Sequence, residues 1–307
     1  MAPAEKLSAR GWKVDAFILS GFSRYAERVS GVSKVWPVGF KERRNRDGVL
    51  DPAKHTYLST GVDYEEYINL YCPGWRHEFA SKGRPTWDRT ECFFASAGFD
   101  VSEAQAPVIE IREEDTAGAA RLLKRHGVER RDGLVVLQPF STAVWRDWPG
   151  DSWRILGREL AGMGLCPVVV GTKRFEDAQM PQLRNLDPDD LIGLVAMADL
   201  LVVPDSGLSH LAAAVGTPAL GLFGPTGGDL IAKHYEHAAV IQGQVGAGSA
   251  CCPPCYMSSH RGFSADCRER SCPAMASISP DQVMEKAASL LASREVRCVR
   301  SEKIATK

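Results

Sequence analysis

The stretch LLVVPDSGLSHLAAAVGTPALGLFGPT, residues 200–226, decides the fold class of this chain. Leu200–Val203 is a short apolar run that predicts a buried strand, Ser206–Val215 has the alanine-rich composition of a helix, and Ala219–Phe223 predicts a second strand. Short apolar strands joined by a helix are typical of a parallel sheet with helices on both faces. The sequence therefore predicts an α/β fold.

The same alternation of strands and helices extends on both sides of this stretch. Upstream, strands are predicted at Leu134–Gln138 and Pro167–Val170, and helices at Trp153–Met163 and Asp189–Met197. Downstream, Pro280–Leu291 predicts a last helix, and the polar residues 296–307 predict a flexible tail. Residues 131–295 are therefore expected to form a Rossmann-like domain with a cysteine-rich insertion at 251–272.

A second domain, also Rossmann-like, is expected over residues 1–130. Strands are predicted at Val14–Leu19 and Lys34–Val38, and helices at Pro3–Arg10, Arg24–Val29 and Glu113–His126. A doubly wound domain normally opens with a strand, whereas this chain opens with the helix at Pro3–Arg10. We therefore expect the first strand of this domain, and the loop after it, to be missing.

Composition excludes several classes of function. The chain has 307 residues, 44% hydrophobic and 24% charged, which is ordinary for a globular protein of about two domains. It carries 37 Lys and Arg against 38 Asp and Glu, and so lacks the basic surplus expected of a protein that binds nucleic acid. No apolar run in the sequence approaches the ~18 residues needed to cross a bilayer, and no signal-peptide core follows the N-terminus. These features predict a cytoplasmic protein with no transmembrane segment and no nucleic acid partner.

The turn between the strand at Leu200–Val203 and the following helix has the features of an anion site. Asp205 and Ser206 are good N-cap residues, and Gly207 leaves room for a ligand to approach the backbone. The first amides of the helix then point at the ligand from the positive end of the helix dipole, with His210 one turn further on the same face. Glycine-rich turns are also common in any parallel α/β domain, so this pattern alone leaves a purely structural role open.

A hydrolytic triad of Asp205, Ser206 and His210 is a further interpretation of the same turn. A nucleophile elbow requires glycine two residues before the serine, and position 204 is proline. The triad is therefore disfavoured.

A second loop, QPFSTAVWRDWP at 138–149, follows the predicted strand at Leu134–Gln138. The hydroxyls of Ser141 and Thr142 can donate to phosphate oxygens, and Arg146 can clamp a phosphate with two parallel hydrogen bonds. Alternatively, this is a surface loop whose tryptophans pack on the domain.

Together, STAVWRDWP and DSGLSHLAAAVGTPALGLFGPT resemble glycosyltransferase family 9, the ADP-heptose:lipopolysaccharide heptosyltransferases and their relatives. The resemblance is specific over about residues 133–285. It implies a GT-B architecture, in which two Rossmann-like domains with parallel sheets face a central cleft. The N-terminal domain would hold the acceptor, and the C-terminal domain the nucleotide-sugar donor.

The resemblance also implies which residues bind the donor. The expected donor-phosphate loop contains Ser141, Thr142 and Arg146, and the expected second donor motif contains Asp205, Ser206, Gly207 and His210. In relatives, the loop after the strand at Val168–Gly171 often supplies an acidic residue to the nucleoside. Lys173 stands at that position here, with Glu176 and Asp177 further on, which leaves the donor's base and sugar open.

The reaction implied is an inverting, metal-independent transfer of a heptose-like sugar. The donor would be an ADP-sugar or another nucleotide-diphospho-sugar, and the acceptor lipopolysaccharide, another glycan or a protein. Such an acceptor could bring the protein into peripheral contact with the inner membrane face. Arg146 and the helix start at Ser206 would stabilise the charge that develops on the leaving diphosphate.

The catalytic residue is not identified by the sequence. In this family the catalytic Asp belongs to the loop after the first strand, which is expected to be missing here. Asp15 and Asp63 are candidates for a replacement, although both also fit as polar residues at strand ends. A non-catalytic nucleotide-sugar-binding or assembly protein is therefore the alternative function. A sugar-nucleotide epimerase is disfavoured, because such enzymes have Ser-Gly-Gly where Gly207 is followed by Leu208.

Five of the nine cysteines lie within residues 251–272. Four of them follow the pattern C-x2-C-x11-C-x4-C, namely Cys252, Cys255, Cys267 and Cys272. Paired thiolates at this spacing suit a structural zinc or iron ion, and a subset of the family is similar in carrying an iron-binding cysteine finger. Reduced thiols or a disulfide are the alternatives, and His260 could replace one ligand.

Overall fold

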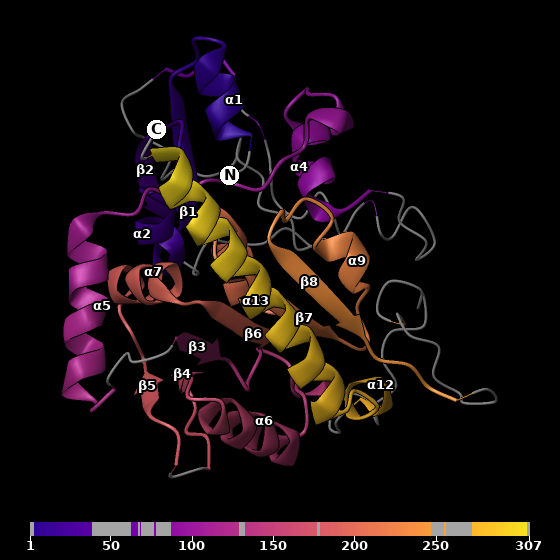
Figure 1. The fold of residues 1–307 in the computed structure, drawn as a ribbon. Helices are drawn as coiled ribbons and strands as arrows, with labels where there is room; N and C mark the ends of the chain where they lie inside the picture. Colours follow the sequence, from indigo (N-terminus) through magenta and orange to yellow (C-terminus); the bar gives the residue numbers. More distant parts are fainter. Residues whose placement is uncertain are drawn as a thin grey trace. The chain divides into compact units, whose positions relative to one another are not determined.

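The computed structural model describes residues 3–38, 63–66, 68, 77, 87–128, 133–176, 179–246, 255 and 272–305, with side chains as far as residue 293. The chain divides into two compact units, Met1–Glu110 and Ile111–Lys307, here called the N-terminal unit and the C-terminal unit (Figure 1). Among the described residues, no helix is both long and apolar enough to span a bilayer.

A two-stranded parallel sheet lies in the N-terminal unit. β1 (Val14–Leu19) pairs with β2 (Val32–Val38), and the chain between them passes through the 3-10 helix η1 (Ser20–Phe22) and the helix α2 (Ser23–Ala26). A crossover of this kind is required because parallel neighbours cannot be joined by a tight turn. The two predicted strands are confirmed, and the helix predicted at Arg24–Val29 is shorter than expected.

Short helices flank this sheet in the sequence. They are α1 (Ala4–Ala9), α4 (Arg89–Ser96) and the 3-10 helix η3 (Val101–Glu103). A capping box starts α4: the side chain of Asp88 accepts from Glu91 N at 2.6 Å, and that of Glu91 accepts from Asp88 N at 2.7 Å. At the other end of α4, Phe94 is fully buried against Phe99, with ring centroids 5.7 Å apart.

The C-terminal unit is built on a six-stranded sheet in the order β5-β4-β3-β6-β7-β8, and every pairing is parallel. The strands are β3 (Leu134–Leu137), β4 (Cys166–Gly171), β5 (Gln182–Arg184), β6 (Leu200–Pro204), β7 (Ala219–Phe223) and β8 (Ala238–Gln242). This is the strand order of a doubly wound Rossmann fold, in which the chain reverses its direction of travel between β3 and β6. Loops at the carboxyl ends of these two strands therefore border the position where such folds bind ligands.

Helices connect these strands and cover the sheet (Figure 1). The helices of this unit are α5 (Glu113–Arg125), η4 (Val144–Arg146), α6 (Gly150–Gly162), α7 (Pro188–Met197), α8 (Gly207–Val215), α9 (Gly228–Ile231), α12 (Pro273–Ala276) and α13 (Pro280–Ala305). Strands β3, β6 and β7 are buried at every residue, so both faces of the central sheet are covered, as their continuous apolar sequences predict.

The main hydrophobic core forms where alternate side chains of the sheet meet α6 and α13. Its members from these elements are Val135, Leu137, Trp153, Leu156, Leu160, Val169, Leu200, Val202, Leu220, Leu222, Val283 and Ala287. Burying one side chain of this size stabilises the fold by about 1.5–3 kcal/mol. This packing fixes the strands, and therefore the loops at their ends.

Helix α8 matches its prediction closely. It begins at Gly207 after the N-cap residue Ser206, and it ends at Gly216, whose φ of +76° is the left-handed conformation that glycine adopts without strain. The hydroxyl of Thr217 donates to Val195 O at 2.7 Å and ties this end of the helix to α7.

Two boundaries differ from the sequence prediction. The predicted division at residues 130 and 131 assigns α5 to the N-terminal domain, whereas the structure places α5 in the C-terminal unit, where it packs on α7. The structure also continues α13 to Ala305, through most of the predicted flexible tail. Residues 292–305 contain neither glycine nor proline, so nothing in this segment ends the helix.

The contact between α5 and α7 provides a test of this packing. A Cβ atom at Gly193 of α7 would lie 2.1 Å from Asp115 O and 2.4 Å from its carbonyl carbon, so the two helices would have to move apart. We expect Gly193→Ala to lower the free energy of unfolding by about 1–3 kcal/mol, measured by urea denaturation. The matched control is Gly162→Ala in α6, where no atom lies within 4 Å of the new Cβ, and it should be neutral or slightly stabilising. Equal effects of the two substitutions would contradict the close packing.

Candidate functional site

The two loops singled out in the sequence meet at the carboxyl ends of β3 and β6. These strands are neighbours, with Leu137 opposite Val202, and Gln138 N extends the pairing by donating to Val202 O at 3.0 Å. The loop after β3 runs through η4 to the start of α6, and the turn after β6 leads directly into α8. The site therefore lies at the switch point of the sheet.

An ion pair joins the two loops. Arg146 Nη1 lies 3.1 Å from Asp205 Oδ2, and Arg146 Nη2 donates to Thr142 Oγ1 at 2.6 Å. The side chains of Arg146 and Asp205 are only 18% and 13% exposed, so solvent screens this pair less than a surface ion pair. Within the described part of the chain, the buried Arg146 Nε has no hydrogen-bond partner, so the guanidinium retains donor capacity beyond these two contacts.

Asp147 organises the loop after β3, a role that the sequence analysis did not identify. Its Oδ1 accepts from Ser141 N and from Ser141 Oγ, each at 2.7 Å. Ser141 Oγ also lies 2.7 Å from Ala143 O and accepts from Ala143 N at 3.1 Å. Because this hydroxyl has a single proton, its hydrogen bonds serve the loop itself. The structure thus gives Ser141 a loop-shaping role, and its expected contact with phosphate stays a prediction.

Burial raises the pKa of the Asp147 carboxyl above its usual value. The hydrogen bonds from Ser141 oppose this rise, as do the positive charges of Lys173 and Arg146. Asp147 is therefore a partly desolvated carboxylate beside two cations.

Trp148 anchors the far end of the same loop. It is 2% exposed, its ring centroid lies 5.1 Å from that of Trp153, and its Nε1 donates to Ile278 O at 2.9 Å. Trp148 therefore packs on the domain, as the alternative interpretation of this loop predicted. It does not exclude a ligand site, because Arg146 and Thr142 precede the anchor and face Asp205.

The start of α8 has the features of an anion site. The N-cap residue Ser206 makes no side-chain capping bond, because its Oγ donates to Gln138 Oε1 at 2.5 Å. Gly207 is exposed, and a Cβ built there would meet no atom of the described residues within 4 Å. The first turn of the helix thus has open space before it and is not capped by the side chain of Ser206.

His210 lies on the exposed face of α8, next to Tyr235. The two rings meet edge to face with centroids 5.7 Å apart, and His210 Nδ1 shares a hydrogen bond with the Tyr235 hydroxyl. Tyr235 was not identified from the sequence, because its proximity to His210 arises from the position of the chain between α9 and β8.

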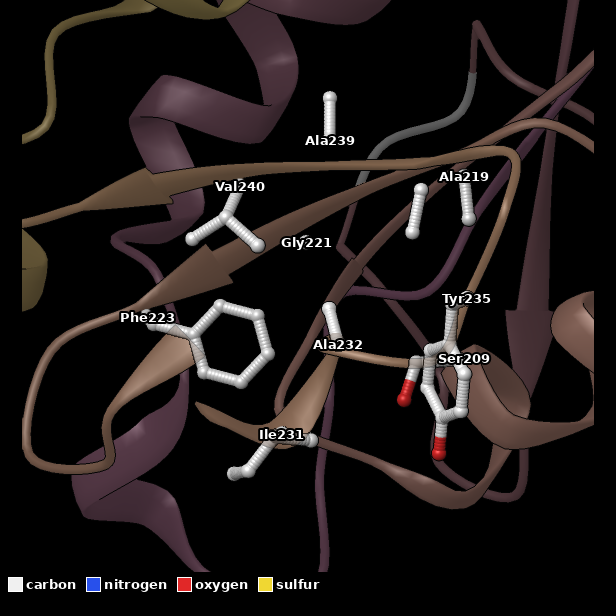
Figure 2. A pocket seen from close by; sticks show the side chains of 10 residues that line it. Ser209, Ala219, Gly221, Phe223, Ile231, Ala232, Tyr235, Ala239 and Val240 are labelled. Atoms are coloured by element: carbon white, nitrogen blue, oxygen red, sulfur yellow. The ribbon is translucent and has the colours of Figure 1, made fainter. Parts of the chain in front are cut away.

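A small pocket is lined by Tyr235 and by residues of α8, α9, β7 and β8 (Figure 2). Its lining is mainly apolar and contains no charged side chain: Ser209, Ala219, Gly221, Phe223, Ile231, Ala232, Tyr235, Ala238, Ala239 and Val240. The hydroxyl of Ser209 donates to Ser206 O at 2.7 Å. This pocket therefore lacks the groups needed to bind a diphosphate.

Both candidates for the catalytic residue, Asp15 and Asp63, belong to the N-terminal unit. Asp15 is the second residue of β1, and its Oδ2 accepts from Trp36 Nε1 at 3.0 Å and from Tyr64 OH at 2.8 Å. Among the described residues, its buried Oδ1 has no hydrogen-bond partner. Asp63 is exposed, outside the strands of the described residues. The catalytic residue stays unassigned.

The predicted metal site is described only in part. Cys255 is half-buried, and Cys272 is the N-cap residue of α12 and packs against the main core. The other expected ligands, Cys252 and Cys267, and the substitute His260, lie outside the described residues, as does Asp177. The zinc or iron site stays a prediction.

Comparison with known proteins identifies the family. Residues 55–252 match glycosyltransferase family 9 (heptosyltransferase). The chain is 27% identical over 163 residues to lipopolysaccharide heptosyltransferase 2 of Escherichia coli, an alignment that covers 48% of this chain and 43% of the relative. The corresponding protein of Salmonella typhimurium is 27% identical over 164 residues, which cover 48% and 44% of the two chains. The alignments thus span less than half the length of these curated relatives.

Three solved structures share the fold. A family 9 glycosyltransferase from Veillonella parvula has a TM-score of 0.66 at 18% identity, covering 95% of this chain and 92% of that one. The ADP-heptose LPS heptosyltransferase II of E. coli has a TM-score of 0.61 at 14% identity, covering 96% and 94%. The E. coli heptosyltransferase WaaC with ADP-2-deoxy-2-fluoro heptose has a TM-score of 0.55 at 16% identity, covering 94% of both chains.

These structural matches and the parallel α/β organisation define a GT-B fold, as the sequence predicted. The family match extends over most of the chain, including both loops of the candidate site. The chain belongs to glycosyltransferase family 9, the heptosyltransferase family.

The environment of Asp147 predicts a pH dependence of stability. Its folded-state pKa is raised above 3.8, so the folded chain holds this proton more tightly than the unfolded chain, and ionisation destabilises the fold. Asp147→Asn keeps an acceptor for Ser141 and removes the charge. We expect the stability of the wild type relative to this variant to fall as the pH rises from about 3.5 to about 7, measured by urea unfolding. A difference that stays constant over this range would contradict the burial of this carboxylate.

Proposed function

We propose that the loops after β3 and β6 bind the diphosphate of a nucleotide-sugar donor, and that the protein transfers the sugar to an acceptor. An ADP-heptose-type donor is favoured because a protein of the same fold, E. coli WaaC, has a solved structure with ADP-2-deoxy-2-fluoro heptose. The proposed acceptor is lipopolysaccharide or another glycan or protein, in keeping with the E. coli relative named lipopolysaccharide heptosyltransferase 2. A cytoplasmic location is part of this proposal.

The observation that carries the proposal is the Arg146–Asp205 ion pair, 3.1 Å long, at the switch point. It places a guanidinium with remaining donor capacity next to an open helix start. A guanidinium and the amides of a helix N-terminus are both suited to phosphate oxygens, and here they come from two loops that the sheet brings together.

In the proposed reaction, the sugar is transferred by a direct displacement at its anomeric carbon. The acceptor hydroxyl oxygen forms a bond to the anomeric carbon of the sugar while the bond from that carbon to the diphosphate breaks. The proton of the hydroxyl passes to a general base, and the nucleoside diphosphate leaves from the opposite face, which inverts the anomeric configuration. Arg146 and the first amides of α8 stabilise the negative charge that develops on the leaving diphosphate. In this proposal the transfer needs no bound metal, because cationic side chains and helix amides stabilise the leaving diphosphate in its place.

Binding of ADP tests the proposed donor site. We expect Arg146→Ala to weaken ADP binding by about 10- to 100-fold, since a hydrogen bond to a charged group contributes roughly 1.5–3 kcal/mol. Isothermal titration calorimetry measures the effect. The matched control is Arg158→Ala, which removes the same charge from an exposed position on α6 and should leave the affinity unchanged. A wild-type protein that binds neither ADP nor UDP would overturn the proposal.

Turnover tests the proposed reaction separately. We expect release of ADP from ADP-heptose when a lipopolysaccharide acceptor is present, and loss of this release in Arg146→Ala. Intact ADP binding with no donor consumed, over a panel of glycan and protein acceptors, would instead identify a nucleotide-sugar-binding or assembly protein.

A further inference from the structure

The charged side chains Arg146, Asp205 and Asp147 leave the candidate site without a net positive charge. Arg146 is paired with Asp205 at 3.1 Å, and Asp147 places a second carboxylate in the same loop. A diphosphate brings more than one negative charge to this position. The site therefore needs another cation to hold the nucleotide by charge.

The loop after β4 lies beside these residues, because β4 is the neighbour of β3 in the sheet. Phe175 anchors this loop: it is 3% exposed, and its ring centroid lies 6.1 Å from that of Phe140. The side chain of Gln182 binds both backbone groups of Phe175, accepting from its N at 3.0 Å and donating to its O at 2.5 Å. The position of the loop is thus set by a buried ring and two hydrogen bonds.

This anchor presents Lys173 to the loop after β3. Lys173 Nζ lies 5.7 Å from the ring centroid of Phe140, the residue before Ser141, and its positive charge acts on Asp147. Lys173 is exposed, and within the described part of the chain it forms no ion pair. Its ammonium group is therefore a cation near the donor site whose charge is not cancelled by a direct partner.

We propose that Lys173 is a second cation of the donor site and binds the phosphate nearer to the nucleoside. In sheets with this strand order, the diphosphate lies at the switch point and the nucleoside extends over the adjacent strand, which here is β4. A carboxylate at the end of that strand suits the ribose hydroxyls, whereas a cation suits a phosphate. This inference rests on the proposed function. It adds that a positive charge in the loop after β4 recognises a phosphate of the nucleotide.

The second cation, Lys173, would also stabilise the leaving nucleoside diphosphate. Arg146 and Lys173 belong to different loops and approach the diphosphate from two sides. Two positive charges from the protein can stabilise the departing nucleoside diphosphate in the way that a divalent ion does in other transferases.

Calorimetric titration with ADP, AMP and adenosine tests the role of Lys173 in the full chain. We expect Lys173→Ala to weaken the binding of ADP and of AMP by about tenfold and to leave adenosine unaffected, because adenosine has no phosphate. Lys173→Arg should retain most of the affinity. The dependence of ADP binding on salt concentration should become weaker in Lys173→Ala, because one ion contact is lost.

The neighbouring residue provides the control. Arg174→Ala removes the same charge from an exposed position one residue away and should change ADP affinity little. If ADP binds Lys173→Ala as tightly as the wild type, or if Arg174→Ala has an equal effect, the role of Lys173 is refuted while the proposed function stands. If the wild type binds no nucleoside diphosphate, or Arg146→Ala binds ADP normally, the proposed function itself fails.

Discussion

The ion pair between Arg146 and Asp205 is the constraint on which the rest of the candidate site depends. It connects two residues that are 59 positions apart in the sequence and follow neighbouring strands of one sheet. Each partner would be costly to keep half-buried without the other, because a desolvated charge needs a compensating one. The pair therefore holds the loop after β3 against the start of α8, and it gives both loops a defined position at the switch point.

The central part of the fold could be predicted from the sequence because each strand there is a continuous apolar run. β6, α8 and β7 fall within a residue of their predicted limits, and β3 and β4 are also close. β5 could not be predicted, since its three residues, Gln182–Arg184, contain a single apolar side chain and pair only with β4. The assignment of α5 to the C-terminal unit could not be predicted either. It depends on the tertiary contact between α5 and α7, and the sequence of α5 alone does not indicate that contact.

In the candidate site, too, the local sequence motifs predicted some residues, whereas the contacts between residues depend on the tertiary fold. The motifs identified Thr142, Arg146 and Asp205, and in the structure Arg146 contacts both of the other side chains. The partner of Ser141 could not be chosen from the sequence, where Asp147 is one of many acidic residues. For Ser141, the sequence shows only that a hydroxyl lies in a loop. The structure shows that this hydroxyl forms hydrogen bonds to Asp147 and Ala143 of the same loop.

The bond from Ser206 to Gln138 has a consequence for the stability of α8. A serine at this position normally completes the first turn of its helix, but here its hydroxyl is directed to the end of β3 instead. An anion bound before Gly207 would act as a removable cap, so helix order and occupancy become thermodynamically linked. Amide hydrogen exchange at Gly207 and Leu208 would then slow when the site fills, and the first turn of α8 would serve as a built-in reporter of ligand binding.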